Sequence, residues 1–252
     1  MSRSDRHDGP VAVIAATEGE LAPLRASVDG PEIVALPGSD GAWRGRIAGR
    51  PLVLAVSGVG TVAAATTVAA LAAHVAPSAV LVTGIAGAYV GAFVPVGVAV
   101  AAASEHDLDA GVLGRNEQVS LATIALPRGE GPDGPIFEHL PTDPGWRSVL
   151  ARACGTVALP FATSDAISGD LDVAAARAAR SGAAIESMEG VGAALACARL
   201  GLPFGELRGV SNVAGVRDKA AWDVPAALRA ATRALRIALA AGPDPGPATP
   251  GT

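Results

Sequence analysis

Short apolar runs alternate with longer alanine-rich runs along most of the chain. The short runs are rich in Val, Ile and Leu and have the length of buried strands, whereas the longer runs have the length of helices. We expect strands near residues 11–15, 52–56, 79–83, 97–102, 182–186 and 204–210, and helices near residues 19–28, 60–75, 171–180, 188–200 and 223–241. This alternation is typical of an α/β protein with helices on both faces of its sheet, so we predict a three-layer α/β/α sandwich.

No linker or internal repeat interrupts this pattern, which predicts a single domain over residues 10–241. Residues 1–9 are mostly polar and lead directly into the first strand, so we expect a flexible tail and no signal peptide there. Residues 242–252 are mainly Pro, Gly, Ala and Thr, and this composition predicts a disordered C-terminal tail.

Residues 77–104 contain no charged side chain, and an apolar stretch of more than about 18 residues can span a membrane. The glycines and prolines within the stretch, together with Thr83, disfavour such a helix. Its apolar segments around residues 80–82 and 98–100 instead predict two buried parallel strands, joined by residues 84–97. We therefore expect no membrane attachment.

The 252 residues carry a formal net charge of −5 and no basic cluster, which disfavours nucleic acid as a partner. The two cysteines, Cys154 and Cys197, are far apart in the sequence and fit reduced thiols in a cytoplasmic protein. The four histidines lack the spacing of metal ligands. Our prediction is no metal, and His106 with Asp107 and Asp109 is the one alternative.

Residues 185–190 read Ile-Glu-Ser-Met-Glu-Gly and place a carboxylate, Glu189, at the start of a run without charge. One interpretation is an acid that is stabilised by the free N–H groups of a helix start. The other is that its two oxygens accept hydrogen bonds from a pair of sugar hydroxyls. Met188 similarly either fills the core or offers a soft surface to a sugar.

Residues 203–212 have the pattern of a short strand that ends in Ser211 and Asn212. Ligands of open α/β sheets lie beyond the carboxyl ends of strands, so these two side chains are candidates for a binding site. Ordinary turn chemistry is the alternative.

Together, these two stretches resemble the purine nucleoside phosphorylase and nucleosidase superfamily, in particular its hydrolytic branch of methylthioadenosine nucleosidases and futalosine hydrolases. Residues 11–20, 56–64 and 83–88 resemble three further parts of that branch: the first strand with its acidic turn, the loop that holds phosphate or water, and the glycine-rich ribose turn. The resemblance covers roughly residues 11–240. It implies a homo-oligomeric nucleosidase that acts on a small-molecule nucleoside without a cofactor.

The resemblance also implies roles for individual residues. Glu20 matches the general base that activates a water, and such a base contributes a rate factor of about 10² to 10⁴. Glu189 matches the residue that binds the ribose hydroxyls as positive charge grows on the sugar. The implied site residues are Glu20 and Asn212 for catalysis and, for substrate binding, Ile85, Gly87, Ile167, Ser187, Met188, Glu189, Arg208 and Ser211.

Three positions of this chain differ from the residues that the methylthioadenosine nucleosidases have there. Ile167 stands where they have a base-stacking aromatic residue, and Ile85 stands where they have a hydroxyl. Asn212 stands where they have the aspartate that recognises a 6-amino purine. An amide can accept from a protonated N7 and donate to a 6-oxo group, so Asn212 predicts a hypoxanthine nucleoside.

Within the hydrolytic branch, the 6-oxopurine substrate is futalosine, an intermediate of menaquinone biosynthesis. The resemblance therefore implies hydrolysis of its N-glycosidic bond, with release of hypoxanthine. The carboxylate-bearing 5′ tail of futalosine needs a cation or N–H donors, for which Arg115, His106 and Arg217 are candidates.

Phosphorolysis is the nearest alternative reaction. Phosphorylases hold phosphate with arginines, whereas residues 57–67 and 83–91 contain no Arg or Lys, and Arg25 is a possible exception. A more remote alternative is an NAD-dependent oxidoreductase, because residues 58–63 fit the loose dinucleotide pattern, although no acid follows at residues 79–83. A non-catalytic nucleoside-binding protein is disfavoured by the presence of Glu20.

Overall fold

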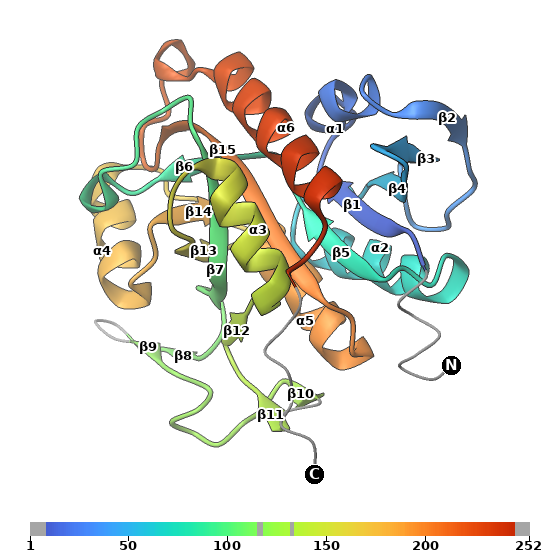
Figure 1. Cartoon of the computed structure of the whole chain (residues 1–252). Coiled ribbons are helices and arrows are strands. Elements are labelled where there is room, and N and C mark those ends of the chain that lie inside the picture. The colour runs from blue at the N-terminus through green and yellow to red at the C-terminus, as the bar shows by residue number, and fades with distance from the viewer. Residues whose placement is uncertain (1–8, 115–117, 132–133, 245–252) are drawn as a thin grey trace.

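A sheet of 11 strands runs through the centre of the molecule, in the order β12-β7-β13-β14-β6-β15-β5-β1-β4-β3-β2 (Figure 1). The computed structural model describes residues 9–114, 118–131 and 134–244. The strands of the sheet are β1 (Val11–Ala15), β2 (Asp29–Ile33), β3 (Gly41–Ile47), β4 (Arg50–Val56), β5 (Ala79–Val82), β6 (Ile85–Ala88), β7 (Ala99–Asp107), β12 (His139–Pro141), β13 (Leu159–Thr163), β14 (Ile185–Ser187) and β15 (Phe204–Val213).

Helices cover both faces of this sheet. Figure 1 shows α3 and α6 in front of the strands, with α2 and α5 behind them. The helices are α1 (Glu18–Arg25), α2 (Thr61–His74), α3 (Pro144–Cys154), α4 (Leu171–Ser181), α5 (Gly190–Leu200) and α6 (Val224–Ala241), with short 3₁₀ helices η2 (Val90–Ala92) and η3 (Lys219–Ala221). This arrangement confirms the predicted three-layer α/β/α sandwich.

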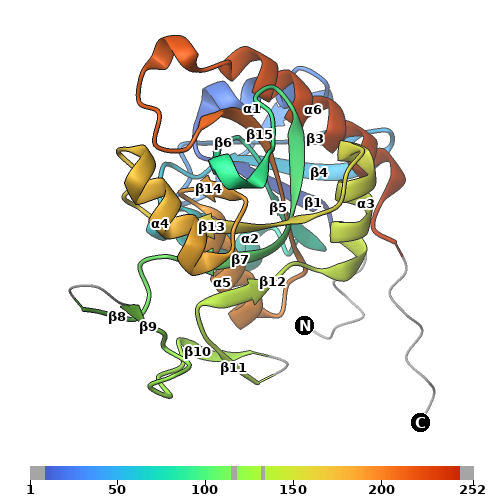
Figure 2. The ribbon, with the colours of Figure 1, turned by 90° about the vertical axis from the view of Figure 1, so that its left-hand side faces the viewer.

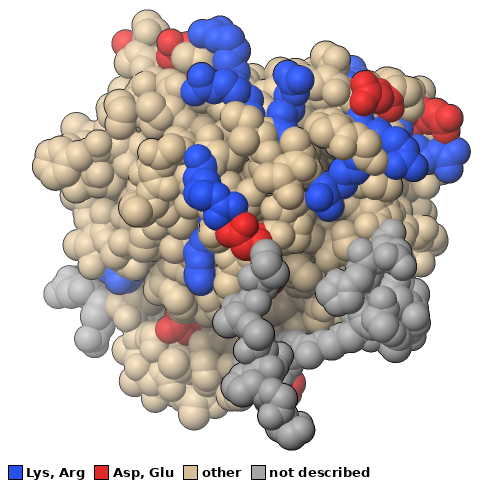
Figure 3. All heavy atoms as spheres, in the orientation of Figure 1, with Lys and Arg blue, Asp and Glu red and all other residues tan. Residues whose placement is uncertain are grey.

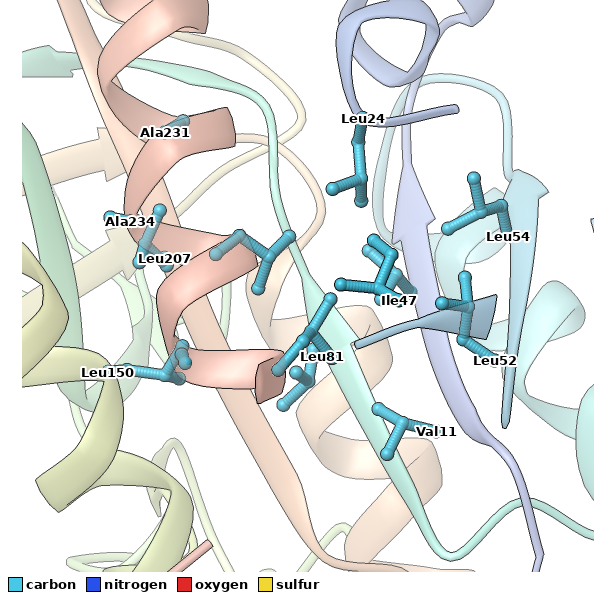
Figure 4. Packing of buried hydrophobic residues seen from close by; sticks show 14 of the residues in the cluster. Val11, Leu24, Ile47, Leu52, Leu54, Leu81, Leu150, Leu207, Ala231 and Ala234 are labelled. Carbon is cyan, nitrogen blue, oxygen red and sulfur yellow. The ribbon is translucent and has the colours of Figure 1, made fainter. Parts of the chain in front are cut away.

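Alternate residues of β1 enter two different hydrophobic cores. Val11 and Val13 pack with α1, α3 and α6, and Ala12 and Ile14 pack with α2 and α5. Figure 4 shows the first core, where Leu81 and Leu207 lie beside α6. Since successive side chains of a strand point to opposite faces, a strand between two helical layers has to be apolar throughout. That is why the central strands were recognisable as continuous apolar runs.

Half of the sheet closes on itself. β15 pairs with β6 and with β7, and the chain of pairings β7–β13, β13–β14 and β14–β6 completes a ring of strands. Side chains from four of these strands pack together: Val100, Phe161, Ile185 and Val210. The other half, from β5 to β2, remains an open sheet that carries the N-terminal part of the chain.

Two expectations for residues 77–104 are wrong. Residues 84–97 are not a plain connection, because they contain β6. In addition, β5 and β7 are not parallel, since β15 pairs with β5 in parallel and with β7 in antiparallel orientation. Apolar content reports burial and carries no information on strand direction. The turn between β5 and β6 depends on Gly84, whose φ of 133° disfavours any residue with a Cβ.

The sequence pattern also missed several elements. Strands β2 and β3 form an edge hairpin, and all residues of β2 are exposed, so neither shows the apolar run of a buried strand. Helix α3 lies in the segment 104–160, where the resemblance is weakest, and strand β13 begins at the end of that segment. Two small hairpins, β8 (Val112–Leu113) with β9 (Gln118–Val119) and β10 (Gly129–Gly131) with β11 (Gly134–Ile136), stand outside the layered body in Figures 1 and 2.

The predicted tails lie mostly outside the described residues, which begin at Gly9 and end at Asp244. Asp244 accepts hydrogen bonds from Ser148 at 2.6 Å and from Arg152 at 2.7 Å, so the chain is tied to α3 just after α6 ends. Within the described ranges, no helix combines the length and the apolar character needed to cross a bilayer.

Candidate functional site

The candidate residues gather at the carboxyl ends of five strands. Glu20 follows β1, Gly60 follows β4, Gly84 follows β5, Glu189 follows β14, and Asn212 is near the end of β15. Four of these strands, β1, β4, β5 and β15, run parallel and bring their carboxyl ends to one edge of the sheet, where loops and helix starts leave polar groups for a ligand. Strand β14 runs opposite to β15, and the contacts of Glu189 with Gly60 and Arg208 place it in the same cluster. Residues from far apart in the sequence therefore form one cluster.

Glu20 is held by two sets of donors. Thr17 donates to its Oε2 from the backbone N–H at 3.1 Å and from the hydroxyl at 3.0 Å, which is part of the capping box of α1. The backbone N–H of Ile85 donates to its Oε1 at 2.9 Å. This N–H replaces the side-chain hydroxyl that the resemblance implied at position 85. Glu18, by contrast, is 64% exposed and pairs with Arg25.

Arg208 is the buried cation of the cluster. Its Nε donates to Glu206 at 2.7 Å and its Nη2 donates to Glu189 at 3.1 Å. Its Nη1 and the Oε1 of Glu20 lie 3.0 and 2.5 Å from the point where Gly84 would carry a Cβ, so any side chain there would collide with both. Burial acts to lower the pKa of Arg208, but Glu206, Glu189 and Glu20 outweigh it and raise the pKa above its ordinary value.

Carboxylates also occupy the start of α2. Gly60 donates its N–H to Oε1 of Glu189 at 3.2 Å, and Thr61 donates to Asp165 from its N–H and its hydroxyl, both at 2.8 Å. Free N–H groups at a helix start are the usual anion site of such loops. Here these donors are already paired and surrounded by negative charge, which disfavours a phosphate dianion.

Asn212 is 5% exposed and its amide is fixed by its neighbours. The hydroxyl of Ser211 donates to its Oδ1 at 2.7 Å, and its Nδ2 donates to the carbonyl of Val213 at 2.9 Å. Asn212 pairs with Gly87 across β6 and β15, beside an irregularity in register. A Cβ at Gly87 would lie 3.2 Å from the Cα of Ala214, so a larger residue would displace this part of β15.

Ile167 lies on a loop that is tied down on both sides. Asp165 bonds to the start of α2, and Ser168 donates to Glu186 from its N–H at 2.8 Å and from its hydroxyl at 2.5 Å. Arg177 pairs with the same carboxylate at 3.1 Å. The loop thus holds the half-buried Ile167 beside the helix start that Glu189 also contacts.

Ser187 and Met188 lead from β14 to Glu189. Ser187 is buried, and its hydroxyl lies 3.4 Å from that of Thr163 on β13. Met188, between Ser187 and Glu189 in the sequence, is half-buried. It therefore exposes part of a soft, apolar side chain.

Two of the three candidate cations for an acidic tail are described. Burial lowers the pKa of His106, so a positive charge at this histidine is disfavoured. Arg217 is exposed and stacks over the ring of Trp222 at 5.2 Å. Arg115 lies outside the described residues. Arg25 stacks over Trp43 at 4.3 Å and pairs with Glu18, so it is already engaged.

A surface hollow of about 600 Å³ lies away from this cluster. Its lining includes Pro10 and Leu52, at the amino ends of β1 and β4, and His74 at the end of α2. Because ligands of α/β sheets bind at the opposite, carboxyl ends, we assign no role to this hollow.

On the face seen in Figure 3, Lys and Arg side chains are scattered, with acidic side chains beside several of them.

Sequence reasoning missed four residues of the cluster. Thr17 and Asp165 hold Glu20 and the start of α2, and Glu105 and Glu206 lie behind Arg208. Glu206 had a detectable signal, since two charged residues two positions apart on a buried strand must share one face. In the described residues, no group of three or more His, Cys, Asp or Glu side chains is placed to hold a metal ion.

The family description "Phosphorylase superfamily" fits residues 10–241, and the chain belongs to this superfamily. Within it, a futalosine hydrolase from Thermus thermophilus is 38% identical over 220 residues, which cover 87% of this chain and 94% of that protein.

Solved structures agree with this assignment. A methylthioadenosine/S-adenosylhomocysteine nucleosidase from S. pneumoniae, bound to a transition-state inhibitor, matches with a TM-score of 0.78 and 26% identity over 92% of this chain and 99% of that one. Futalosine hydrolase of Helicobacter pylori matches with a TM-score of 0.76 over 92% of this chain and 98% of that one, and at 18% identity it supports the fold.

Proposed function

We propose that this protein hydrolyses the N-glycosidic bond of futalosine and releases hypoxanthine. The observation that carries the proposal is the place of Asn212, buried at the carboxyl end of β15 and fixed by Ser211. Its amide offers the donor and acceptor pattern of a 6-oxopurine. The identity with futalosine hydrolase from Thermus thermophilus, 38% over most of both chains, supports the same substrate.

Cleavage of this bond has three requirements, and the cluster has a group for each. A nucleophile must reach the anomeric carbon, and Glu20 is the general base that positions and deprotonates a water. Positive charge develops on the sugar, and Glu189 accepts from the ribose hydroxyls and opposes that charge. The leaving base must be protonated, so N7 takes a proton from solvent water, and the Oδ1 of Asn212 stabilises the protonated base by accepting from N7–H of the departing hypoxanthine.

Water is the proposed nucleophile because the donors that would hold phosphate are engaged. Glu189 and Asp165 accept from Gly60 and Thr61, and Arg208 is shared among carboxylates. The same contacts disfavour the dinucleotide alternative, which needs these N–H groups for a pyrophosphate.

The test is a chromatographic assay of base release from futalosine, inosine and methylthioadenosine, each with and without phosphate. We expect hypoxanthine from futalosine at a rate that phosphate does not change. Adenine from methylthioadenosine as the preferred product would contradict the substrate, and dependence on phosphate would contradict hydrolysis. No release from any nucleoside would favour a binding protein.

We further propose that the protein acts as a homo-oligomer in the cytoplasm. Phe93 is 91% exposed, and its φ of 53° lies in the left-handed region. Val90 near it is 65% exposed. A bulky apolar residue held there against its conformational preference is consistent with a subunit contact. Light scattering should then give more than one subunit, and Phe93→Glu should lower that number.

A further inference from the structure

Two buried carboxyl groups face each other behind Arg208. Glu105 on β7 and Glu206 on β15 are both 0% exposed. The Oε1 of Glu105 and the Oε2 of Glu206 each lie 2.5 Å from the point where Gly190 would carry a Cβ. Among the described residues, these two oxygens and one of Glu138 are the buried side-chain atoms without a hydrogen-bond partner.

A single proton satisfies both oxygens. An ionised carboxylate only accepts, so two facing carboxyl oxygens can bond only when one of them carries hydrogen. Two ionised groups this close, without water, would repel each other strongly. Each unpaired oxygen would also retain the desolvation cost of a buried acceptor.

The hydrogen bonds to the second oxygen of each carboxyl group indicate which of the two acids carries the proton. The second oxygen of Glu206 accepts from Nε of Arg208 at 2.7 Å, and an adjacent guanidinium favours the ionised form of a carboxyl group. The second oxygen of Glu105 accepts from the neutral hydroxyl of Thr163 at 2.6 Å. Burial, and then the charge of Glu206, raise the pKa of Glu105 well above its ordinary value.

We propose that Glu105 and Glu206 are positioning residues that share one proton, carried by Glu105, and that they hold Arg208 and through it Glu189 for glycosidic cleavage. This inference rests on the proposed function of the same site. Both acids are fully buried, so they act through the guanidinium.

The protonation of Glu105 and Glu206 determines how much of the positive charge of Arg208 acts on Glu189. Arg208 bonds to Glu206 at one edge and to Glu189 at another, so its positive charge is divided between two carboxylates. With Glu206 neutral, the guanidinium would pair with Glu189 alone and weaken the negative charge that faces the ribose. With Glu105 ionised, Glu206 would be repelled from Arg208 and the guanidinium would lose its fixed orientation.

Two glutamine variants test the proton assignment. Gln at position 105 copies a protonated acid, since its carbonyl accepts from Thr163 and its NH₂ donates to Glu206. We expect Glu105→Gln, as the conservative variant, to lose much less kcat than Glu206→Gln. Glu206→Gln removes the ionised partner of Arg208, so kcat should fall about tenfold or more, with a smaller change in KM.

Infrared spectroscopy tests the pair without any substrate. Wild type should show the C=O band of a buried protonated carboxyl group at neutral pH, and Glu105→Gln should lack that band. This readout needs no substrate and so separates the inference from the proposed function, which the base-release assay tests. Absence of the band in wild type, or equal losses of kcat in the two variants, would overturn the shared proton and its place on Glu105.

The pH dependence of stability provides the third readout. In the described structure the charged groups that act on Glu105 are Glu206 and Arg208, both on β15, while β13 adds the hydroxyl of Thr163 and α5 adds backbone at Gly190. Because the folded pKa is raised, the folded state binds the proton more tightly than the unfolded state. Stability should therefore fall as pH rises above the ordinary carboxyl range.

Glu105→Gln has no such proton to lose. Its Tm relative to wild type should increase with pH across this window. A constant difference between the two Tm curves, or failure of Glu105→Gln to fold, would contradict the proposal.

Discussion

At the scale of single residues, Glu20 combines a structural and a proposed catalytic role. Its Oε2 completes the capping box of α1 with Thr17, and its Oε1 reaches across to the N–H of Ile85, 65 positions later in the chain. The cap explains why an acid is favourable here in any protein. The second contact directs one carboxylate oxygen to the turn before β6, which a capping role alone does not require.

We expect Glu20→Gln to abolish turnover while nucleoside binding is retained. The amide keeps the shape of the side chain and accepts from Ile85, but it cannot take a proton from water. The loss in kcat should be about 10²-fold or more, since that is the usual contribution of a general base. Single-turnover kinetics and calorimetric binding of futalosine measure the two quantities separately.

Glu18→Gln is the matched control, because Glu18 lies in the same helical turn and pairs with Arg25 at the surface. It should leave kcat unchanged. Near-normal turnover by the Glu20 variant would remove that residue from the role of base.

Asn212 carries the prediction on substrate choice. Asn212→Asp should shift the ratio of kcat/KM toward 6-amino nucleosides by about ten- to a hundredfold, because a mismatched buried donor or acceptor costs about 1–3 kcal/mol. The measurement is base release from paired 6-oxo and 6-amino nucleosides. Asn212→Ala removes both faces of the amide and should lower both rates without reversing the preference. If Asn212→Asp left the ratio of kcat/KM for 6-oxo and 6-amino nucleosides unchanged, recognition of the base by this residue would be refuted.

At the scale of elements, the contact between α2 and α5 sets the geometry of the site. A Cβ at Gly192 would lie 2.0 Å from the carbonyl oxygen of Thr61, so the two helices approach as closely as backbone allows. Thr61 and Gly60 begin α2, and Glu189 immediately precedes α5. Their separation therefore fixes the distance between the loop after β4 and the proposed ribose carboxylate.

Gly192→Ala should destabilise the fold by about 1–3 kcal/mol, the usual cost of overpacking, and should also lower activity by moving Glu189 away from Gly60. Thermal denaturation and base release measure the two effects. Gly169→Ala is the control, since a Cβ there meets nothing within 4 Å and its φ is not in the left-handed region. Equal Tm values for the two variants would contradict the close contact.

At the scale of the whole molecule, one sheet connects all parts of the fold. The open half and the ring of strands share β15, and α6 packs on both. In the described residues, three of the four hydrophobic clusters include a side chain of this strand, namely Leu207, Phe204 or Val210, so we expect the two halves to unfold together.

The two cysteines report this cooperativity. Burial raises the pKa of Cys154 to about 12, and it also raises the pKa of Cys197, which is 0% exposed. Since the thiolate is the reactive form, a thiol reagent at pH 8 should label native protein far more slowly than free cysteine. Labelling in urea should rise together with the change in tryptophan fluorescence.

Cys154→Ala isolates the signal of Cys197 on α5, which lies in the second core. Its labelling midpoint should match the fluorescence midpoint from Trp43, Trp146 and Trp222. Separate midpoints would show that the halves unfold independently.

Much of the fold followed from local pattern. A strand between two helical layers is mostly apolar on both faces, so β1, β4 and β5 could be located without the structure. Edge strands and surface hairpins bury little, and β2 has no apolar pattern to detect. The direction of β7 depends on the connection through β6, which no local pattern encodes.

The sequence by itself selected the residues that we propose for the chemistry: Glu20, Glu189, Arg208 and Asn212 stand in motifs whose side chains have the donors, acceptors and charge that nucleoside cleavage needs. Only the tertiary structure decided what these groups bond to. Arg208 is shared between Glu189 and Glu206, and Asp165 occupies the start of α2, because strand order brings distant residues to one edge of the sheet. Charge balance and protonation depend on distances in space, and sequence neighbours cannot specify them.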